Sequence, residues 1–532
     1  MDRRDLLRAA ATGAVACTLS RPTVAQPSAT ARILRFVPHA NLANLDPIWS
    51  TQLISRTHGF LVYDTLYGTD ADLRAHPQMA EGHTLEEGGT VCTVALREGL
   101  RFHDGEPVLA RDCVASLQRW MRRSPVGQTL GERLDALEAP DDRRLVFRLK
   151  RPFPHLITAL GSVASPVPFI MAERHARTDP FRQVTEVVGS GPFRFRPDEF
   201  VTGSLVVYER NSTYVPAPPG AATSLTAGPK VTHLDRVEWR ILPDAATAAA
   251  ALQAGEVDWY ESPSPEVAER LRRHPALRVE RVDRLPYLGL LRFNHLHAPF
   301  DDARARRALL PAVAQADFMT AIVGSDPGMW RDGAGVFPPG TPYASDAGLA
   351  PLKGTRDLGE AKRLLREAGY DGRPVRLIGT TEGLGAAAAT QVAADLFRRL
   401  GLNLDLVVSD TASWIRRRTS REPLERGGWS AFCTVTPGFE MADPASHAAL
   451  RGNGLAAWPG WPTSPRIEAL REAWLEAPDT LEQERVARQM QDAAMEDLPF
   501  VPLGAYWQNT ALRRDLVGRV SGFPIFWGIR RT

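Results

Sequence analysis

The chain has 532 residues, more than the roughly 250–300 residues at which a single hydrophobic core stops growing, so two or more lobes are expected. Its 64 Lys and Arg residues are balanced by 62 Asp and Glu residues, and no long block of like charge occurs. A net charge of +2 argues against the basic surface that nucleic-acid-binding proteins use.

Residues 1–25 are predicted to be an export signal. Arg3 and Arg4 precede a short, weakly apolar stretch at 9–19, the layout of a twin-arginine signal, and small residues favour cleavage just before Gln26. The stretch is shorter than the roughly 20 apolar residues that cross a bilayer. We therefore expect an exported protein that works in the periplasm.

Two departures keep an alternative route open. Asp2 and Leu6 stand where the twin-arginine pattern usually has Ser or Thr and Phe, so an ordinary Sec signal remains the alternative. Lipoprotein anchoring at Cys17 is not expected, because Ala14 occupies the position that a lipobox gives to Leu.

In the first half of the chain, alternating apolar and polar residues predict strands. These segments are 90–96, 144–149, 204–208 and 237–241. Asp104–Gly105 predicts a tight turn, and a helix is expected to open at Ala110. Cys92 and Cys113 fall at apolar positions of these patterns and are interpreted as small buried hydrophobic residues.

The second half alternates helices with strands. Asp357 and Glu360 form a capping box for a helix that Gly369 ends. A strand at 375–378, a helix at 386–400 and a strand at 402–408 follow. This order predicts an α/β lobe.

Several ordered blocks cover nearly the whole chain after the signal. They are Asn44–Pro47, Tyr63–Leu66, Pro77–Glu81, Leu96–Pro107, Val188–Phe195, Ala251–Asp258, Leu291–Asn294, Pro299–Asp302 and Ala361–Tyr370. Together they resemble the extracytoplasmic solute-binding proteins of ABC importers, in the family that contains the oligopeptide- and dipeptide-binding proteins (solute-binding protein family 5).

The resemblance implies an α/β fold, a two-lobed periplasmic-binding-protein clamshell (type II-like) with an additional α+β domain inserted in the first lobe. The solute is expected in the cleft between the lobes. The implied boundaries are 26–61, 186–285 and 512–532 for lobe I, 62–185 for the extra domain and 286–511 for lobe II.

Candidate ligand-binding residues are mainly aromatic, because ring faces suit a stacked or apolar ligand and exclude water from its polar groups. They are Trp49, Tyr260, Tyr287, Trp330, Trp414, Trp429, Phe432 and Phe439. Gly189 and Ser190 are expected to form a backbone-lined wall of the site. Asp443 is a further candidate, with capping of a helix that starts at Pro444 as the alternative.

Phe432 marks a departure from the peptide binders of this family. In those proteins an Asp a few residues after a Gly-Trp pair typically neutralises the α-ammonium of the ligand, and Phe432 is the nearest equivalent after Gly428–Trp429. Asp443 supplies the carboxylate only if the segment 433–440 loops back.

The expected function is high-affinity capture of a small solute, a peptide or peptide-like molecule, and its delivery to an ABC transporter permease in the inner membrane. The alternatives are a non-peptide solute (an opine, a glutathione-like molecule, a metal chelate, haem or a sugar) and a periplasmic hydrolase. Catalytic motifs such as Gly-x-Ser-x-Gly and His-Glu-x-x-His do not occur, so no enzyme is expected. We further expect no cofactor, no metal, no nucleic-acid partner and a monomer.

Overall fold

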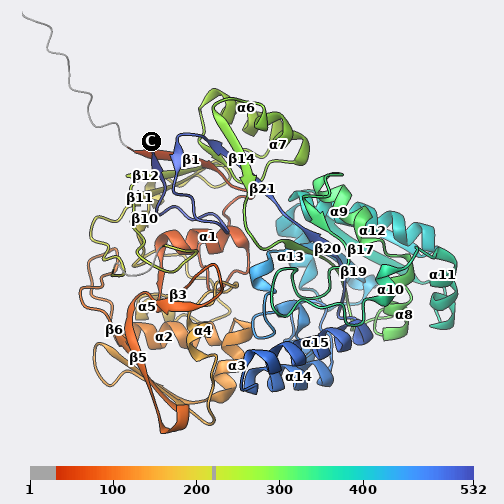
Figure 1. Ribbon diagram of the computed structural model, residues 1–532, viewed down its shortest axis with the longest axis horizontal. Helices are drawn as coiled ribbons and strands as arrows, with labels where there is room; N and C mark the ends of the chain where they lie inside the picture. Colours follow the sequence, from red (N-terminus) through yellow and green to blue (C-terminus); the bar gives the residue numbers. More distant parts are fainter. Residues whose placement is uncertain (1–31, 219–222) are drawn as a thin grey trace, which may run out of the picture.

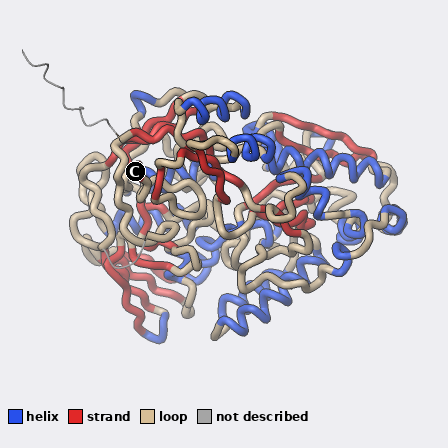
Figure 2. The backbone as a smooth tube through the Cα atoms, turned by 45° about the horizontal axis from the view of Figure 1, so that its top comes forward, coloured by secondary structure: helices blue, strands red, loops and turns tan. Residues whose placement is uncertain are grey.

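The computed structural model describes residues 32–218 and 223–532. These residues form two lobes, each with a large sheet, and a smaller domain beside the first lobe (Figure 1). The strands gather in separate groups that match these parts (Figure 2). The predicted export signal, 1–25, lies outside the described residues. None of the described helices is long and apolar enough to cross a membrane.

Lobe I is built on a seven-stranded sheet of order β10-β11-β12-β1-β13-β21-β14. Its strands are β1 (Ile33–Val37), β10 (Phe193–Phe195), β11 (Leu205–Arg210), β12 (Arg236–Arg240), β13 (Trp259–Tyr260), β14 (Leu277–Arg281) and β21 (Asn509–Arg513). Its helices are α1 (Leu53–Val62), α6 (Ala245–Ala254) and α7 (Pro265–Arg272). Phe36 of the central strand packs on Trp259 and Phe526, with ring centroids 4.9 and 5.2 Å away, so the C-terminal tail closes this core.

The extra domain contains a four-stranded antiparallel sheet of order β5-β6-β8-β7. Its strands are β2 (Asp64–Thr65), β3 (Tyr67–Thr69), β4 (Ala75–Pro77), β5 (Ala80–Glu86), β6 (Val91–Leu96), β7 (Leu134–Glu138), β8 (Arg144–Leu149) and β9 (Phe169–Ile170). Its helices are α2 (Ala110–Met121), α3 (Pro125–Arg133), α4 (Leu156–Leu160) and α5 (Glu173–Ala176). Cys92 and Cys113 are buried free thiols, as their apolar settings predict.

Lobe II is built on a six-stranded sheet of order β16-β20-β15-β19-β17-β18. Its strands are β15 (Tyr287–Phe293), β16 (Trp330–Arg331), β17 (Pro374–Thr380), β18 (Asn403–Ser409), β19 (Ala431–Thr436) and β20 (Phe500–Tyr506). Its helices are α8 (Ala303–Arg307), α9 (Gln315–Val323), α10 (Ala350–Lys353), α11 (Leu358–Glu367), α12 (Leu384–Leu400), α13 (Thr411–Arg418), α14 (Pro465–Glu476) and α15 (Thr480–Asp497). The C-terminal tail adds the short pair β22 (Leu516–Val517) and β23 (Arg530–Arg531).

Alternation along β19 decides which of its side chains face which layer. Ala431 and Cys433 pack into the core that α9 and α12 share with the sheet. Phe432 points to the opposite side, where it joins Trp414 of α13 and Trp429.

The predicted elements are found close to their expected bounds. They are β6, β8, β11, β12, α2, α11, β17, α12 and β18. The Asp357 side chain accepts a hydrogen bond from the Glu360 amide, and α12 ends at Gly401, whose φ of 78° suits a residue without a Cβ atom.

Two short segments connect the lobes. The first, 282–286, joins β14 to β15, and the second, 507–508, joins β20 to β21. Since β21 begins at Asn509 and pairs with β14, the second crossing comes before the expected start of the lobe I tail at 512. Two crossings of this length suit a hinge about which the lobes move as rigid bodies.

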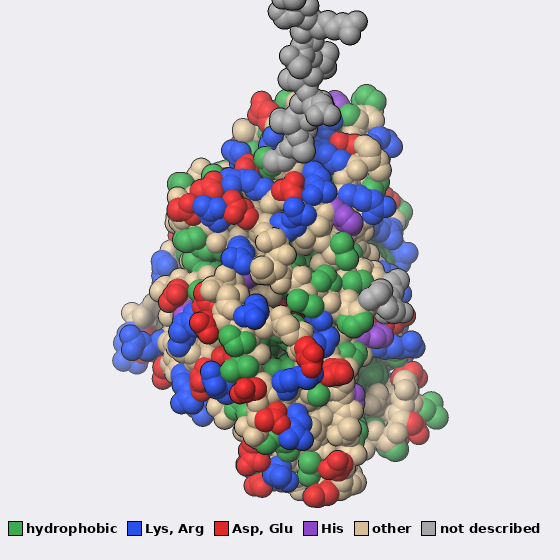
Figure 3. All heavy atoms as spheres, turned by 90° about the vertical axis from the view of Figure 1, so that its left-hand side faces the viewer, with side chains coloured by type: hydrophobic (Ala, Val, Ile, Leu, Met, Phe, Trp, Pro, Cys, Tyr) green, Lys and Arg blue, Asp and Glu red, His purple; other side chains and the backbone are tan. Residues whose placement is uncertain are grey.

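The surface carries mixed charge. Figure 3 shows Lys and Arg side chains interspersed with Asp and Glu side chains over the face that lobe I and the extra domain present. This face has no large region of a single sign, in keeping with the net charge of +2.

Candidate functional site

Charged side chains from both lobes meet beside the hinge. Arg56 of α1 in lobe I donates to Oε1 of Glu440 in lobe II over 2.8 Å. Glu440 ends the short 3-10 helix η6 (Gly438–Glu440), which follows β19. The Arg56 side chain is 2% exposed and that of Glu440 is 16% exposed. The pair therefore joins the two lobes in a nearly dry setting.

Aromatic rings enclose the Arg56 guanidinium. Its central carbon lies 4.6 Å from the ring centroid of Phe439 and 4.3 Å from that of Phe523. Phe439 belongs to lobe II and Phe523 to the C-terminal tail that packs on lobe I. These contacts exclude water from the ion pair, and low local dielectric strengthens it.

A second acidic group lies beside this pair. The His39 amide and its Nδ1 contact Oε2 of Glu261, at 2.7 and 2.8 Å. Glu261 directly follows β13 and is 8% exposed. The charge of Arg56 acts on the pKa of His39, and the charge of Glu261 acts on the pKa of Arg56. The two ion pairs are therefore electrostatically coupled.

The hinge adds a third carboxyl group. Burial raises the pKa of Asp283, which lies between β14 and β15, and the pKa of Glu440 is raised by burial despite the opposing charge of Arg56. Tyr287, at the start of β15, packs against Tyr506 with tilted rings whose centroids are 5.5 Å apart. Burial also raises the pKa of the Tyr287 hydroxyl, so this group stays neutral at pH 7.

The cluster combines three carboxyl groups with several cations. Glu440 pairs with Arg56 and Glu261 with the titratable ring of His39, while Asp283 feels the charges of Arg519 and Arg284. Among the described residues, His39 donates only to Oε2 of Glu261 and Arg56 only to Oε1 of Glu440, so one oxygen of each carboxylate is open to a cationic group.

A pH-dependent contribution to stability is expected from His39. Burial alone lowers the pKa of this ring, but the charge and hydrogen bond of Glu261 outweigh it and raise the pKa above 6.5. A raised pKa means that the stabilisation is fully present below the unfolded pKa and is lost as pH rises through the folded pKa. In thermal unfolding, the melting temperature of wild type should therefore exceed that of His39→Gln by more at pH 6 than at pH 9. Equal differences at both pH values would contradict this assignment.

The extra domain forms a second contact with lobe II. His155 stacks on Trp474 of α14 with ring centroids 4.5 Å apart. Arg133 and Arg151 form ion pairs with Glu472 of α14. Figure 1 shows α3 and α14 next to each other at this contact. The two lobes thus touch at the hinge and through the extra domain.

Three of the predicted site residues lie near the charged cluster. Phe439 packs on Arg56, and Tyr287 interacts electrostatically with Arg56 and with three carboxyl groups. Trp330 of the edge strand β16 pairs in register with Tyr506, whose ring packs against Tyr287. Tyr287 and Tyr506 directly adjoin the hinge segments 282–286 and 507–508.

Three others form a separate aromatic cluster inside lobe II. Trp414, Trp429 and Phe432 are 6%, 0% and 0% exposed. The ring centroid of Phe432 is 5.8 Å from that of Trp414 and 5.1 Å from that of Trp429. Phe432 is thus buried beneath α13 and packs against its Trp414 side chain.

The remaining residues lie elsewhere. Trp49 donates through Nε1 to the carbonyl of Phe181, beside the extra domain. Gly189 packs so closely on α1 that a Cβ atom would lie 1.9 Å from the carbonyl oxygen of Val62. Ser190 follows it and is buried, with no hydrogen-bond partner for Oγ among the described residues.

Tyr260 and Asp443 also have structural settings. Tyr260 packs with α6 and α7 in the lobe I core. Asp443 accepts hydrogen bonds from the amides of Ala445 and Ser446, at 2.8 and 2.9 Å. The alternative prediction, that Asp443 caps a helix starting at Pro444, was wrong because no helix begins there. The Asp443 carboxylate instead caps a turn by accepting hydrogen bonds from these two amides.

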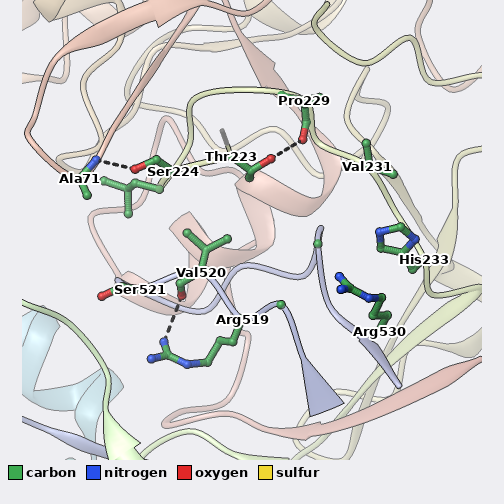
Figure 4. Close-up of a pocket in the computed structure, with 13 residues that line it drawn as sticks. Ala71, Thr223, Ser224, Pro229, Val231, His233, Arg519, Val520, Ser521 and Arg530 are labelled. Atoms are coloured by element: carbon green, nitrogen blue, oxygen red, sulfur yellow. Dashed lines mark hydrogen bonds between the residues drawn. The ribbon is translucent and has the colours of Figure 1, made fainter. Parts of the chain in front are cut away.

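An open hollow of about 630 Å³ lies on lobe I beside the C-terminal tail (Figure 4). Arg519, Arg530 and His233 line it, and Arg519 is already paired with Glu280 and donates to the carbonyls of Val282 and Val520. The remaining wall is largely small or apolar. The lobe interface offers more polar groups for a ligand, so we place the candidate site there.

Sequence reasoning missed most of the charged cluster. His39, Arg56, Glu261 and Glu440 are far apart in the chain and belong to no short motif. The only local signal was the turn-rich segment after β19, in which Gly438 approaches the hinge: a Cβ atom there would lie 2.4 Å from the carbonyl oxygen of Pro286.

Known proteins resemble this chain over its full length. Residues 74–446 match the model of bacterial extracellular solute-binding proteins, family 5. A probable peptide ABC transporter periplasmic-binding protein of Sinorhizobium fredii, y4tO, is 35% identical over 538 residues, covering 100% of both chains.

Solved structures share the fold. The periplasmic binding protein AgaA from A. tumefaciens R10, in complex with agropinic acid, superposes with a TM-score of 0.79 at 20% identity, covering 94% of this chain and 99% of AgaA. DppA from Helicobacter pylori, in complex with the peptide STSA, gives a TM-score of 0.78 at 21% identity, covering 94% and 98%. The chain therefore belongs to the bacterial extracellular solute-binding proteins of family 5.

Proposed function

We propose that the protein captures a peptide in the periplasm and delivers it to the permease of an ABC transporter. The carboxylates at the lobe interface carry this proposal, because Arg56 and His39 use only one oxygen each of Glu440 and Glu261 and the other oxygens suit a ligand ammonium. The name of the relative from Sinorhizobium fredii, a probable peptide-binding protein at 35% identity, supports a peptide over the other solutes considered.

Two carboxylate oxygens are proposed to receive the ligand. Arg56 and the Ser165 amide both donate to Oε1 of Glu440, and no donor in the described part of the chain reaches Oε2. His39 likewise uses only Oε2 of Glu261. An ammonium group that binds between the two free oxygens loses its hydrogen bonds to water. Charge-assisted hydrogen bonds to the carboxylates replace them.

Binding is coupled to movement of the lobes in this proposal. Arg56 and Glu440 approach only when the lobes are together, so ligand contacts on both sides stabilise the closed arrangement. We infer that the protein binds without turnover and acts as a monomer. Trp414, Trp429 and Phe432 then support the lobe II wall of the site.

The export route belongs to the same proposal. The arginine pair Arg3–Arg4 favours twin-arginine export, with cleavage before Gln26. Replacing both arginines by Lys should leave precursor in the cytoplasm. Normal periplasmic accumulation of that variant would instead assign the protein to the Sec route.

Mass spectrometry of small molecules released from the purified protein by mild unfolding tests the proposed ligand. Peptides with a free amino terminus are expected from wild type, and Glu440→Gln should yield less of them because it removes one carboxylate. Recovery of only amine-free solutes, such as sugars, would show that the acidic cluster serves another purpose.

A further inference from the structure

Two buried ion pairs fix the extra domain to lobe I. Arg119 of α2 pairs with Asp46 of lobe I over 2.7 Å, and Asp64 of β2 pairs with Lys230 of lobe I over 2.6 Å. None of these four side chains is more than 2% exposed. Because separation of a buried ion pair leaves uncompensated charges, we expect the extra domain to move together with lobe I.

The ion pairs between the extra domain and lobe II are more accessible to water. Arg151, just after β8, pairs with Glu472 of α14 over 2.8 Å and also with Glu476 of the same helix. The side chains of Arg151, Glu472 and Glu476 are 50%, 39% and 53% exposed. Arg133, at the end of α3, pairs with Glu472 as well. Within 32–218 and 223–532, the cations that pair with these two carboxylates all come from the extra domain.

Uncharged contacts accompany these ion pairs. The ring of His155, at the start of α4, stacks on Trp474 of α14 with an angle of 20° between the ring planes. Nε2 of Gln483, on α15, lies 3.5 Å from Nε2 of the same His155 ring. Arg451 of lobe II donates to the carbonyl of Pro125, the first residue of α3, over 3.1 Å. The contact thus extends from α3 and α4 of the extra domain to α14 and α15 of lobe II.

This contact lies away from the hinge. In Figure 1, α3 and α14 are at the lower edge of the molecule, whereas β20 and β21, which the second hinge segment joins, are well above them. A rigid-body rotation displaces most the points that are farthest from its axis, so opening of the lobes separates the extra domain from α14. Resting on the proposed function, we propose that Arg133, Arg151 and His155 form a clamp that stabilises the closed arrangement. A larger closed population raises the apparent affinity for a solute by the same factor.

Reversal of one charge of the clamp provides a test that needs no solute. Small-angle X-ray scattering is measured on the mature protein after unfolding and refolding have removed bound molecules. Arg151→Glu places like charges against Glu472 and Glu476, so its ratio of closed to open molecules should fall about threefold or more and its radius of gyration should exceed that of wild type. Arg151→Glu combined with Glu476→Arg forms an ion pair of the opposite polarity and should return the radius of gyration toward that of wild type.

Arg485→Glu is the matched control. It makes the same charge change on α15, where the Arg485 side chain is 56% exposed and pairs with Glu482 of the same helix, so the radius of gyration should equal that of wild type. The clamp is overturned if Arg151→Glu has the radius of wild type, if the double variant stays as expanded as Arg151→Glu, or if Arg485→Glu expands the protein equally. Since no solute is added, a protein that captures something other than a peptide gives the same result in this test.

Discussion

Replacing Asp46 by Ala is expected to lower the free energy of unfolding by about 3–5 kcal/mol, because it leaves the buried Arg119 guanidinium without its counter-ion. Both side chains are 0% exposed, and Arg119 Nη2 donates to Asp46 Oδ2 over 2.7 Å. Asp46 also accepts from the amides of Ile48, Trp49 and Val184. The substitution therefore removes an ion pair and one hydrogen bond, from Val184, that join lobe I to the extra domain, and two hydrogen bonds within lobe I.

The exposed pair of Asp141 and Arg144 provides a matched control. The two side chains are 42% and 59% exposed, so water screens their attraction. Asp141→Ala should unfold at the same urea concentration as wild type. Equal losses of stability in Asp46→Ala and Asp141→Ala would show that burial does not set the strength of these ion pairs.

Glu440→Gln is expected to weaken peptide binding by about 30-fold or more. Removal of one partner from a buried charge pair at an interface costs about 2–5 kcal/mol, and every 1.4 kcal/mol is a factor of ten. The variant leaves Arg56 uncompensated between Phe439 and Phe523 in the closed arrangement. It also removes the carboxylate that we assign to the ligand ammonium.

Isothermal titration with a peptide recovered from wild type measures this effect. The control Glu422→Gln removes an exposed carboxylate of lobe II, whose side chain is 51% exposed and pairs with Arg426. It should bind as wild type does. If Glu440→Gln binds the peptide with unchanged affinity, Glu440 does not contribute to the ligand site.

Local patterns were sufficient to predict most of the fold. Alternation predicted β6, β8, β11 and β12, and capping residues predicted α11, because these signals depend on neighbours in the chain. The family resemblance predicted the clamshell fold. The start of β21 at Asn509 depends on pairing with β14, a long-range contact that local alternation does not encode.

The candidate site was harder to predict for a related reason. Alternation along β19 places Phe432 among the rings beneath α13. The carboxylate at the interface comes from the turn after the strand, at Glu440, which meets Arg56 384 positions away. A sequence pattern indicates that this turn exists, but packing of Gly438 against the hinge determines which of its side chains reaches lobe I.

Small-angle X-ray scattering of the wild-type protein, with and without a peptide recovered from it, tests the central claim that the solute is held between two closing lobes. We predict a decrease in the radius of gyration at saturating peptide, since the hinge segments 282–286 and 507–508 allow rigid-body closure. A radius of gyration that stays constant, while calorimetry shows that the peptide is bound, would contradict the account.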